Sequence, residues 1–223
     1  MNEFLPFCEV LNQLNRSFTF FDLGADIGVV SSLIASHCPK VHNFIAFEPN
    51  PHSFETLRAN LEQINKSVVC INAAVSNFDG SAKFHFNHKR ANDHEGYIDE
   101  KAKGSTEVLT LDTWHSKQTN CCLEGTLVFK IDVEGQELAA FEGASSLILN
   151  AESCIVLLEI HPEVLDRVGQ TPEDLFTSAE KLASFKWYVP ELGNLPVIRS
   201  IPFYTQFELK QYDVIGISQS GDV

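Results

Sequence analysis

Residues 18–28 read FTFFDLGADIG, and they decide how the chain folds. The first four of them are aromatic or β-branched and predict a buried strand. Gly24 then lets the chain turn sharply and lets a ligand approach the backbone closely. A helix is predicted from near Gly28, with Val30, Leu33, Ile34 and His37 on one face. The order of strand, glycine turn and helix indicates one unit of an α/β sheet.

The same alternation of strand and helix continues along the chain. Asn50 and Thr171 are expected to cap helices that begin with a proline. A further helix is predicted from the apolar spacing of Leu138, Phe141, Ala144 and Ile148. Apolar stretches predict more strands at residues 43–47, 68–71, 127–131 and 154–160, and near 186–189 and 212–217. Apolar strands separated by amphipathic helices are typical of a parallel sheet covered on both faces.

One region, at about residues 77–110, interrupts this pattern. It begins with a turn and a stretch that alternates as a strand does, continues through a polar stretch at 87–104, and looks extended again at 106–111. We interpret it as an inserted hairpin whose tip closes over the acceptor as a lid. Residues 1–223 as a whole are predicted to be a single domain, because a chain of this length can bury a substantial core.

Composition excludes several classes of partner. The formal net charge is −14, and the richest basic stretch, residues 85–90, runs directly into acidic residues, so nucleic acid is not an expected partner. No apolar run approaches the length of a membrane span, and no signal-peptide pattern is present, which favours a cytoplasmic location. The six cysteines lack CxxC and zinc-ligand spacing and are expected to be reduced thiols. The sequence predicts no oligomeric state.

The glycine turn favours one cofactor over another. Its spacing differs from the dinucleotide pattern G-x-G-x-x-G, because Asp22 stands where that pattern has its first glycine. A carboxylate there repels a pyrophosphate and attracts an ammonium or a sulfonium group. The turn therefore favours S-adenosylmethionine over NAD, with an ordinary tight turn and an NAD-dependent oxidoreductase as the alternatives.

Two further motifs follow the second and third predicted strands. Glu48, in FEPNP at residues 47–51, can accept hydrogen bonds from both ribose hydroxyls of an adenosine, or it can be an acid that favours a helix start. Ala73 leaves room for an adenine ring, and Asn72 can bond its edge, unless this segment is a plain turn.

Charged residues end the next two predicted strands. Lys130, Asp132 and Glu134 close a buried strand, which is costly unless they are paired or open to a site. An ion pair between Lys130 and Asp132 is the structural alternative. His161, in LEIHP at residues 158–162, is expected to face the same crevice as Asp132 and to act there as a general base.

Taken in order, the segments DLGADIG, FEPNP, KIDVEGQE and LEIHP resemble the FkbM-type methyltransferases. The resemblance runs from about Phe18 to His161. It implies a Rossmann-like, seven-strand, mostly parallel sheet, S-adenosylmethionine as the methyl donor, and O-methylation of a hydroxyl on a sugar, glycan or natural product. Asp26 departs from the asparagine that is usual in the family and adds a negative charge to the turn.

The motifs and the resemblance together give two sets of candidate residues. The cofactor-binding set is Asp22, Gly24, Ala25, Gly28, Glu48, Pro49, Asn72, Ala73 and Asp132. The catalytic set is His161, Asp132, Lys130 and Glu134. His161 or Asp132 would remove the acceptor proton; alternatively, Asp132, Glu159 and His161 would hold Mg²⁺ or Mn²⁺. A domain that binds S-adenosylmethionine without catalysis, or a scaffold domain of a larger protein, is the alternative function.

Overall fold

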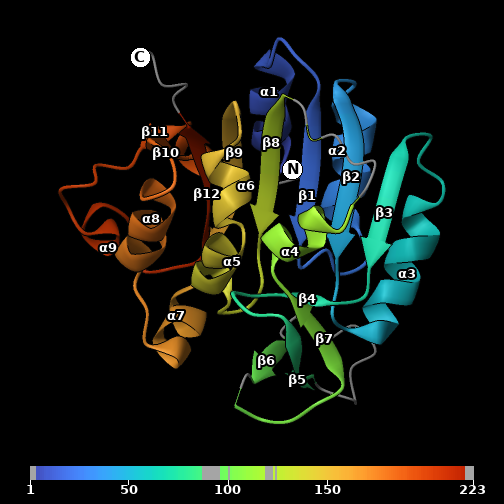
Figure 1. The fold of residues 1–223 in the computed structure, drawn as a ribbon. Helices are drawn as coiled ribbons and strands as arrows, with labels where there is room; N and C mark the ends of the chain where they lie inside the picture. Colours follow the sequence, from blue (N-terminus) through green and yellow to red (C-terminus); the bar gives the residue numbers. More distant parts are fainter. Residues whose placement is uncertain (1–3, 87–95, 100, 119–122, 124, 219–223) are drawn as a thin grey trace.

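The computed structural model describes residues 4–86, 96–99, 101–118, 123 and 125–218. Within them, the chain builds an eight-stranded central sheet (Figure 1). In spatial order its strands are β11 (Leu195–Pro196), β10 (Phe185–Val189), β12 (Tyr212–Ser218), β9 (Ser153–Ile160), β8 (Thr126–Ile131), β1 (Phe18–Leu23), β2 (Val41–Phe47) and β3 (Ser67–Ile71).

Most of this sheet is parallel. The neighbours from β9 through β8, β1 and β2 to β3 pair in parallel, whereas β12 is antiparallel to both β9 and β10. The prediction of a Rossmann-like, mostly parallel sheet is therefore confirmed. The eighth strand is β11, a two-residue edge strand that pairs antiparallel with β10 and that the sequence pattern did not predict.

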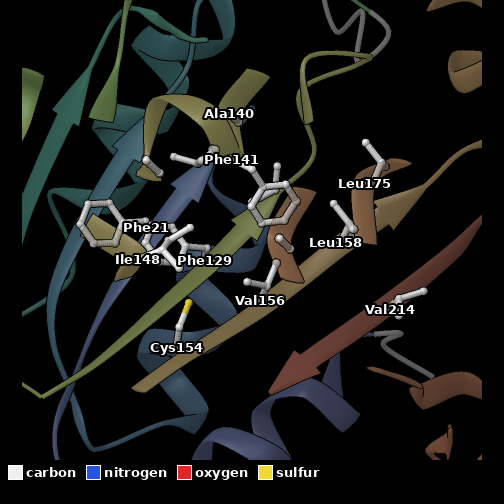
Figure 2. Packing of buried hydrophobic residues seen from close by; sticks show 14 of the residues in the cluster. Phe21, Phe129, Ala140, Phe141, Ile148, Cys154, Val156, Leu158, Leu175 and Val214 are labelled. Atoms are coloured by element: carbon white, nitrogen blue, oxygen red, sulfur yellow. The ribbon is translucent and has the colours of Figure 1, made fainter. Parts of the chain in front are cut away.

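Helices cover both faces of the sheet, because successive side chains of each strand point to opposite sides. Phe20 contacts Phe44 in a core that also holds residues of α1 (Leu5–Gln13) and α2 (Val29–His37). On the other side of the sheet, Phe21 stacks on Phe129 with 4.8 Å between the ring centres. Figure 2 shows Phe141, Ile148 and Leu175 of the covering helices on this side. Those helices are α5 (Glu137–Gly143), α6 (Ser145–Leu149) and α8 (Pro172–Glu180).

Some helices differ from the sequence prediction. The helix expected through Leu138 and Ile148 is broken into α5 and α6 beside Gly143, where an added Cβ would lie 2.1 Å from the carbonyl oxygen of Ser76. His37, predicted on the same face of α2 as Val30 and Ile34, is exposed, whereas those two residues are buried. The remaining helices are α3 (Pro51–Leu61), α4 (Leu111–Ser116), α7 (Pro162–Val168), α9 (Phe203–Gln206) and the 3₁₀ turn η1 (Pro190–Leu192). Across the described residues, no helix combines the length and apolar character needed to cross a membrane.

The predicted insert forms part of a small second sheet, beyond the carboxyl ends of β8, β1 and β2 (Figure 1). Its described strands are β4 (Ala74–Val75), β7 (Thr106–Leu109), β5 (Gly80–His85) and β6 (Tyr97–Asp99). The extended stretch expected at 106–111 ends earlier, because Thr110 caps α4 with a hydrogen bond from the backbone N–H of Thr113. Of the polar stretch predicted at 87–104, residues 87–95 and 100 lie outside the described residues, whereas β6 falls within it as a short strand. The lid and the single domain stay predictions.

Candidate functional site

A cavity of about 360 Å³ lies at the carboxyl ends of the central strands. From β1 the chain moves outward through β2 to β3, and it returns on the other side of β1 as β8 and β9. Ligands of open α/β sheets bind in the crevice that such a reversal leaves. Predicted residues that line the cavity are Gly24, Ala25, Glu48, Pro49, Ala73, Lys130, Asp132 and Glu134.

The turn after β1 forms the floor of the cavity. The N–H groups of Gly24 and Ala25 both donate to the carbonyl oxygen of Phe47, at 3.1 and 2.9 Å, which fixes the turn to the end of β2. Gly24 has φ +75°, and an added Cβ would lie 1.8 Å from the carbonyl oxygen of Asp132. The turn is therefore held between the ends of β2 and β8, with its backbone facing the cavity.

Gly28 lies outside the cavity lining. It has φ +85°, and an added Cβ would lie 2.8 Å from the side chain of Leu57. The close packing predicted at Gly28 is thus made against helix α3 instead of a strand. Gly28 supports the site by letting the start of α2 approach α3.

Glu48 stands at the end of β2, with only 6% of its surface exposed. Its Oε1 accepts from the N–H of Asn50 at 2.7 Å, and its Oε2 accepts from the N–H of Asp26 at 2.8 Å. Burial raises the pKa of Glu48 to about 7, although these two hydrogen bonds act to lower it. Each carboxylate oxygen can accept a second hydrogen bond, so Glu48 keeps acceptor capacity for a ligand.

Asn72 and Ala73 follow β3 and differ in what they face. Ala73 is fully buried from solvent and lines the cavity. Asn72 does not line it: its side-chain amide donates to the carbonyl oxygens of Glu48 and Pro49, at 2.7 and 3.3 Å. Its N–H₂ group thus holds the turn after β2, and a hydrogen bond from Asn72 to the cofactor stays a prediction.

Lys130 connects the end of β8 to the turn after β1. Its Nζ donates to the carbonyl oxygen of Gly24 at 2.7 Å and lies 2.9 Å from Oδ2 of Asp132 and 3.7 Å from Oδ1 of Asp22. Burial lowers the pKa of Lys130, but the two carboxylates outweigh it, so the net direction is upward. The structural ion pair is therefore present, and both of its members also line the cavity.

Asp22 lies beneath the cavity and does not line it. It is 1% exposed, and its Oδ2 accepts a hydrogen bond from Oγ of Ser31 at 2.7 Å. Burial raises the pKa of Asp22, against the attraction of Lys130. Asp22 thus anchors Lys130 and α2, and its contact with the cofactor stays a prediction.

The opposite end of the cavity is acidic. One carboxylate oxygen each of Asp132, Glu134 and Glu159 lies within 4.8 Å of the other two, a spacing that a divalent cation can bridge. Burial and, after it, the charge of Asp132 raise the pKa of Glu159 to about 9. Arg167 of α7 donates to the carbonyl oxygen of Glu134 at 2.7 Å and lies 3.8 Å from its carboxylate.

His161 is not among the described residues that line this cavity, and its role as a general base stays a prediction. β9 ends at Ile160, and the chain turns into α7 with His161 as the cap residue and Pro162 as the first helical residue. Glu159, the last residue of β9 on the cavity side, occupies the place that the sequence analysis gave to His161. The alternative cation site likewise forms with Glu134 instead of His161.

Part of the cavity wall was missed by the sequence analysis. Phe84 and Tyr97 come from the small sheet, and Phe4 comes from the start of the N-terminal helix. The guanidinium of Arg167 lies 4.5 Å from the ring centre of Tyr97, which ties the small sheet to α7. No motif marks these residues, because only the fold brings them to the ends of β1 and β8.

Comparison with known proteins gives three findings. A family model described as a methyltransferase FkbM domain matches residues 22–183. A hexuronic acid methyltransferase of Haloferax volcanii, AglP, is 26% identical over 166 residues, which are 74% of this chain and 63% of that protein. Among solved structures with this fold is an FkbM methyltransferase of Methylobacillus flagellatus, with 14% identity and a TM-score of 0.54 over 90% of this chain and 43% of that one. Another is a putative rRNA methylase of Clostridium thermocellum, with 10% identity and a TM-score of 0.55 over 99% of this chain and 98% of that one.

Proposed function

The chain belongs to the FkbM methyltransferase family, and from this premise we propose that it transfers the methyl group of S-adenosylmethionine to a hydroxyl of a sugar, glycan or natural-product acceptor. The observation that supports this best is the cavity that runs from Glu48 over the Gly24 turn to Asp132. The relative that acts on a hexuronic acid supports a sugar acceptor. The chain spans only 63% of that relative's length, so the acceptor of the relative is not carried over as such.

The donor would lie along the cavity floor. Glu48 would accept hydrogen bonds from the ribose hydroxyls, since each of its oxygens has a lone pair left after its backbone hydrogen bond. Ala73 leaves space for the adenine, and the backbone of Gly24 and Ala25 would face the methionine part. The methyl group would then point toward Asp132.

Asp132 is the proposed general base, in place of His161. The donor supplies a reactive methyl group, so the protein has to position the acceptor oxygen and remove its proton. The side chain of Asp132 is 31% exposed, and Lys130 holds it in place at 2.9 Å. Glu159, whose pKa is raised to about 9, is protonated at neutral pH and would donate a hydrogen bond to the acceptor.

A divalent cation bound by Asp132, Glu134 and Glu159 is the alternative to a base. The first experiment is calorimetric titration with S-adenosylmethionine, followed by a screen of hydroxyl acceptors that detects S-adenosylhomocysteine. Turnover that survives a chelator supports the base, whereas turnover that a chelator removes and Mg²⁺ or Mn²⁺ restores supports the cation. Absence of donor binding would contradict the proposed function.

The pKa of Glu48 predicts a pH-dependent donor affinity. Because the free protein holds this pKa at about 7, Glu48 is mostly protonated at pH 6 and mostly ionised at pH 8. The ionised form accepts ribose hydroxyls more strongly, so donor affinity should rise about five- to tenfold from pH 6 to pH 8. Calorimetry at pH 6, 7 and 8 measures this rise. Glu48→Gln is the control: its affinity should be lower and flat, and an equal rise in this variant would remove Glu48 from the donor site.

His161→Ala is expected to leave kcat and the donor Kd nearly unchanged. Among the described residues, His161 lines neither this cavity nor a second, adjoining cavity. The fall in kcat should therefore be far smaller than the roughly 10²–10⁴-fold that follows the loss of a general base. Steady-state kinetics with a melting curve on the same sample make the comparison. A fall in kcat of that size in a well-folded variant would restore His161 as the base.

A further inference from the structure

A second cavity, of about 250 Å³, begins where the donor cavity ends. The two cavities share Phe4, Lys130, Asp132 and Glu159. The second cavity extends from them to Glu191 of η1 and to Tyr212 and Asp213 at the start of β12. A hollow of a few hundred Å³ is a typical small-ligand site. We propose that this cavity receives the acceptor and that it selects a sugar without a carboxylate, neutral or amine-bearing, over a uronic acid.

The proposal rests on the proposed function, because it takes the first cavity as the donor site. The shared wall is where a methyl group would meet its acceptor, since Asp132 and Glu159 face both hollows. An acceptor in the second cavity would therefore present a hydroxyl to Asp132. Its remaining groups would lie against the residues that only the second cavity contains.

Those residues make the second cavity acidic. Its described lining includes four acidic side chains, Asp132, Glu159, Glu191 and Asp213, against the single cation Lys130. Of these, Glu159 is protonated at neutral pH and Glu191 is paired with Lys210 at 2.7 Å, so Asp132 and Asp213 carry the negative charge. That cation is already engaged by two carboxylates and by the carbonyl oxygen of Gly24. An anionic acceptor would thus meet the charges of Asp132 and Asp213 and find no uncommitted cation among the described lining residues.

The sheet itself concentrates negative charge at this place. In the antiparallel pair of β9 and β12, Glu159 lies directly opposite Asp213. Two charges directly opposite one another would destabilise the sheet pair, so the charge of Asp213 favours the protonated form of Glu159. The charges of Asp132 and Glu134 act on Glu159 in the same direction. A cationic ligand is attracted by the charges around Glu159, whereas a further anion is repelled by them.

Aromatic rings complete the cavity. Phe4 lines both cavities and Tyr212 lines the second. Nζ of Lys210 lies 4.8 Å from the ring centre of Tyr212 and 2.7 Å from Oε1 of Glu191, so one ammonium group already packs on an aromatic face beside this cavity. An amine-bearing sugar would find both carboxylates and an aromatic surface, a combination that suits a cation and disfavours an anion.

The test uses three matched probes with the full chain saturated by S-adenosylhomocysteine: a methyl glucoside, a methyl glucosaminide and a methyl glucuronide. Their Kd values are measured by calorimetry at low salt and at a pH where the amine is protonated. The glucuronide should bind at least about tenfold more weakly than each of the other two, because like-charge juxtaposition opposes binding. Equal or tighter binding of the glucuronide, or binding of none of the three, overturns the proposal.

Two variants separate the charge of the cavity from the charge of the whole protein. Asp213→Asn removes one carboxylate from the cavity and keeps the shape of the side chain. It should therefore reduce the ratio of the glucuronide Kd to the glucoside Kd, called the gap below, severalfold. Glu62→Gln changes the net charge equally but at an exposed helix end outside both cavities, and it should leave the gap unchanged. Equal narrowing in both variants, or in neither, contradicts selection by this cavity.

Two outcomes distinguish a failure of the proposed function from a failure of the acceptor proposal. If S-adenosylhomocysteine itself does not bind, the proposed function is wrong and the acceptor proposal falls with it. If it binds and the glucuronide is accepted as well as the neutral sugar, the acceptor proposal alone is wrong.

Discussion

Asp132→Asn is expected to lower kcat by about 10²–10⁴-fold while the donor Kd changes little, as is usual when a general base is lost. The amide has nearly the shape of the carboxylate but does not take up a proton from the acceptor. Donor affinity should persist because the residues proposed to hold the adenosine, Glu48 and Ala73, are untouched. The measurements are kcat from S-adenosylhomocysteine release and donor Kd by calorimetry.

Glu134→Gln is the matched control for this prediction. Glu134 lines the same cavity, and its substitution by glutamine removes the same charge as Asp132→Asn. Arg167 lies 3.8 Å from the Glu134 carboxylate and donates to the carbonyl oxygen of that residue. If Asp132 is the base, kcat should fall far less in Glu134→Gln than in Asp132→Asn. Similar losses in the two variants, with a chelator silencing the wild type, would instead favour a cation held by the cluster. Lys130 keeps Asp22 and the carbonyl oxygen of Gly24 as partners, so Asp132→Asn should still fold.

The sequence predicted the sheet well because its signals are local. Strand β1 is buried throughout, and the helix starts at Asn50 and Thr171 are capped as expected, the latter by a full capping box with Asp174. Element ends were predicted less well. A single apolar face does not reveal that Gly143 packs against Ser76 and divides one helix into α5 and α6.

The site was predicted where a strand end alone decides it. Glu48 and Asp132 end parallel strands, and the carboxyl ends of such strands meet at one edge of the sheet. Glu159 and His161 show the limit, because the direction of a side chain at a strand end depends on the residue at which the strand stops. Phe4 and Asp213 show a second limit: they reach the site through packing between distant segments, which leaves no motif.

Gly24→Ala is expected to be the most damaging single-methyl change at the site. The added Cβ would lie 1.8 Å from the carbonyl oxygen of Asp132, a backbone atom that cannot move without shifting the end of β8. The residue also has φ +75°. Left-handed backbone costs a residue with a Cβ about 1–2 kcal/mol, and overpacking costs about 1–3 kcal/mol more. The free energy of unfolding should fall by several kcal/mol in denaturant titrations.

Gly193→Ala separates the two causes of this loss. Gly193 has a similar φ of +70°, but an added Cβ would have no atom within 4 Å. This variant should therefore lose only the about 1–2 kcal/mol of the left-handed conformation and keep its donor affinity. Gly24→Ala should lose more stability and, because its turn forms the cavity floor, should also bind S-adenosylmethionine more weakly. If both variants lost equal stability and both bound the donor normally, contact between the turn and β8 would not be what shapes the donor cavity.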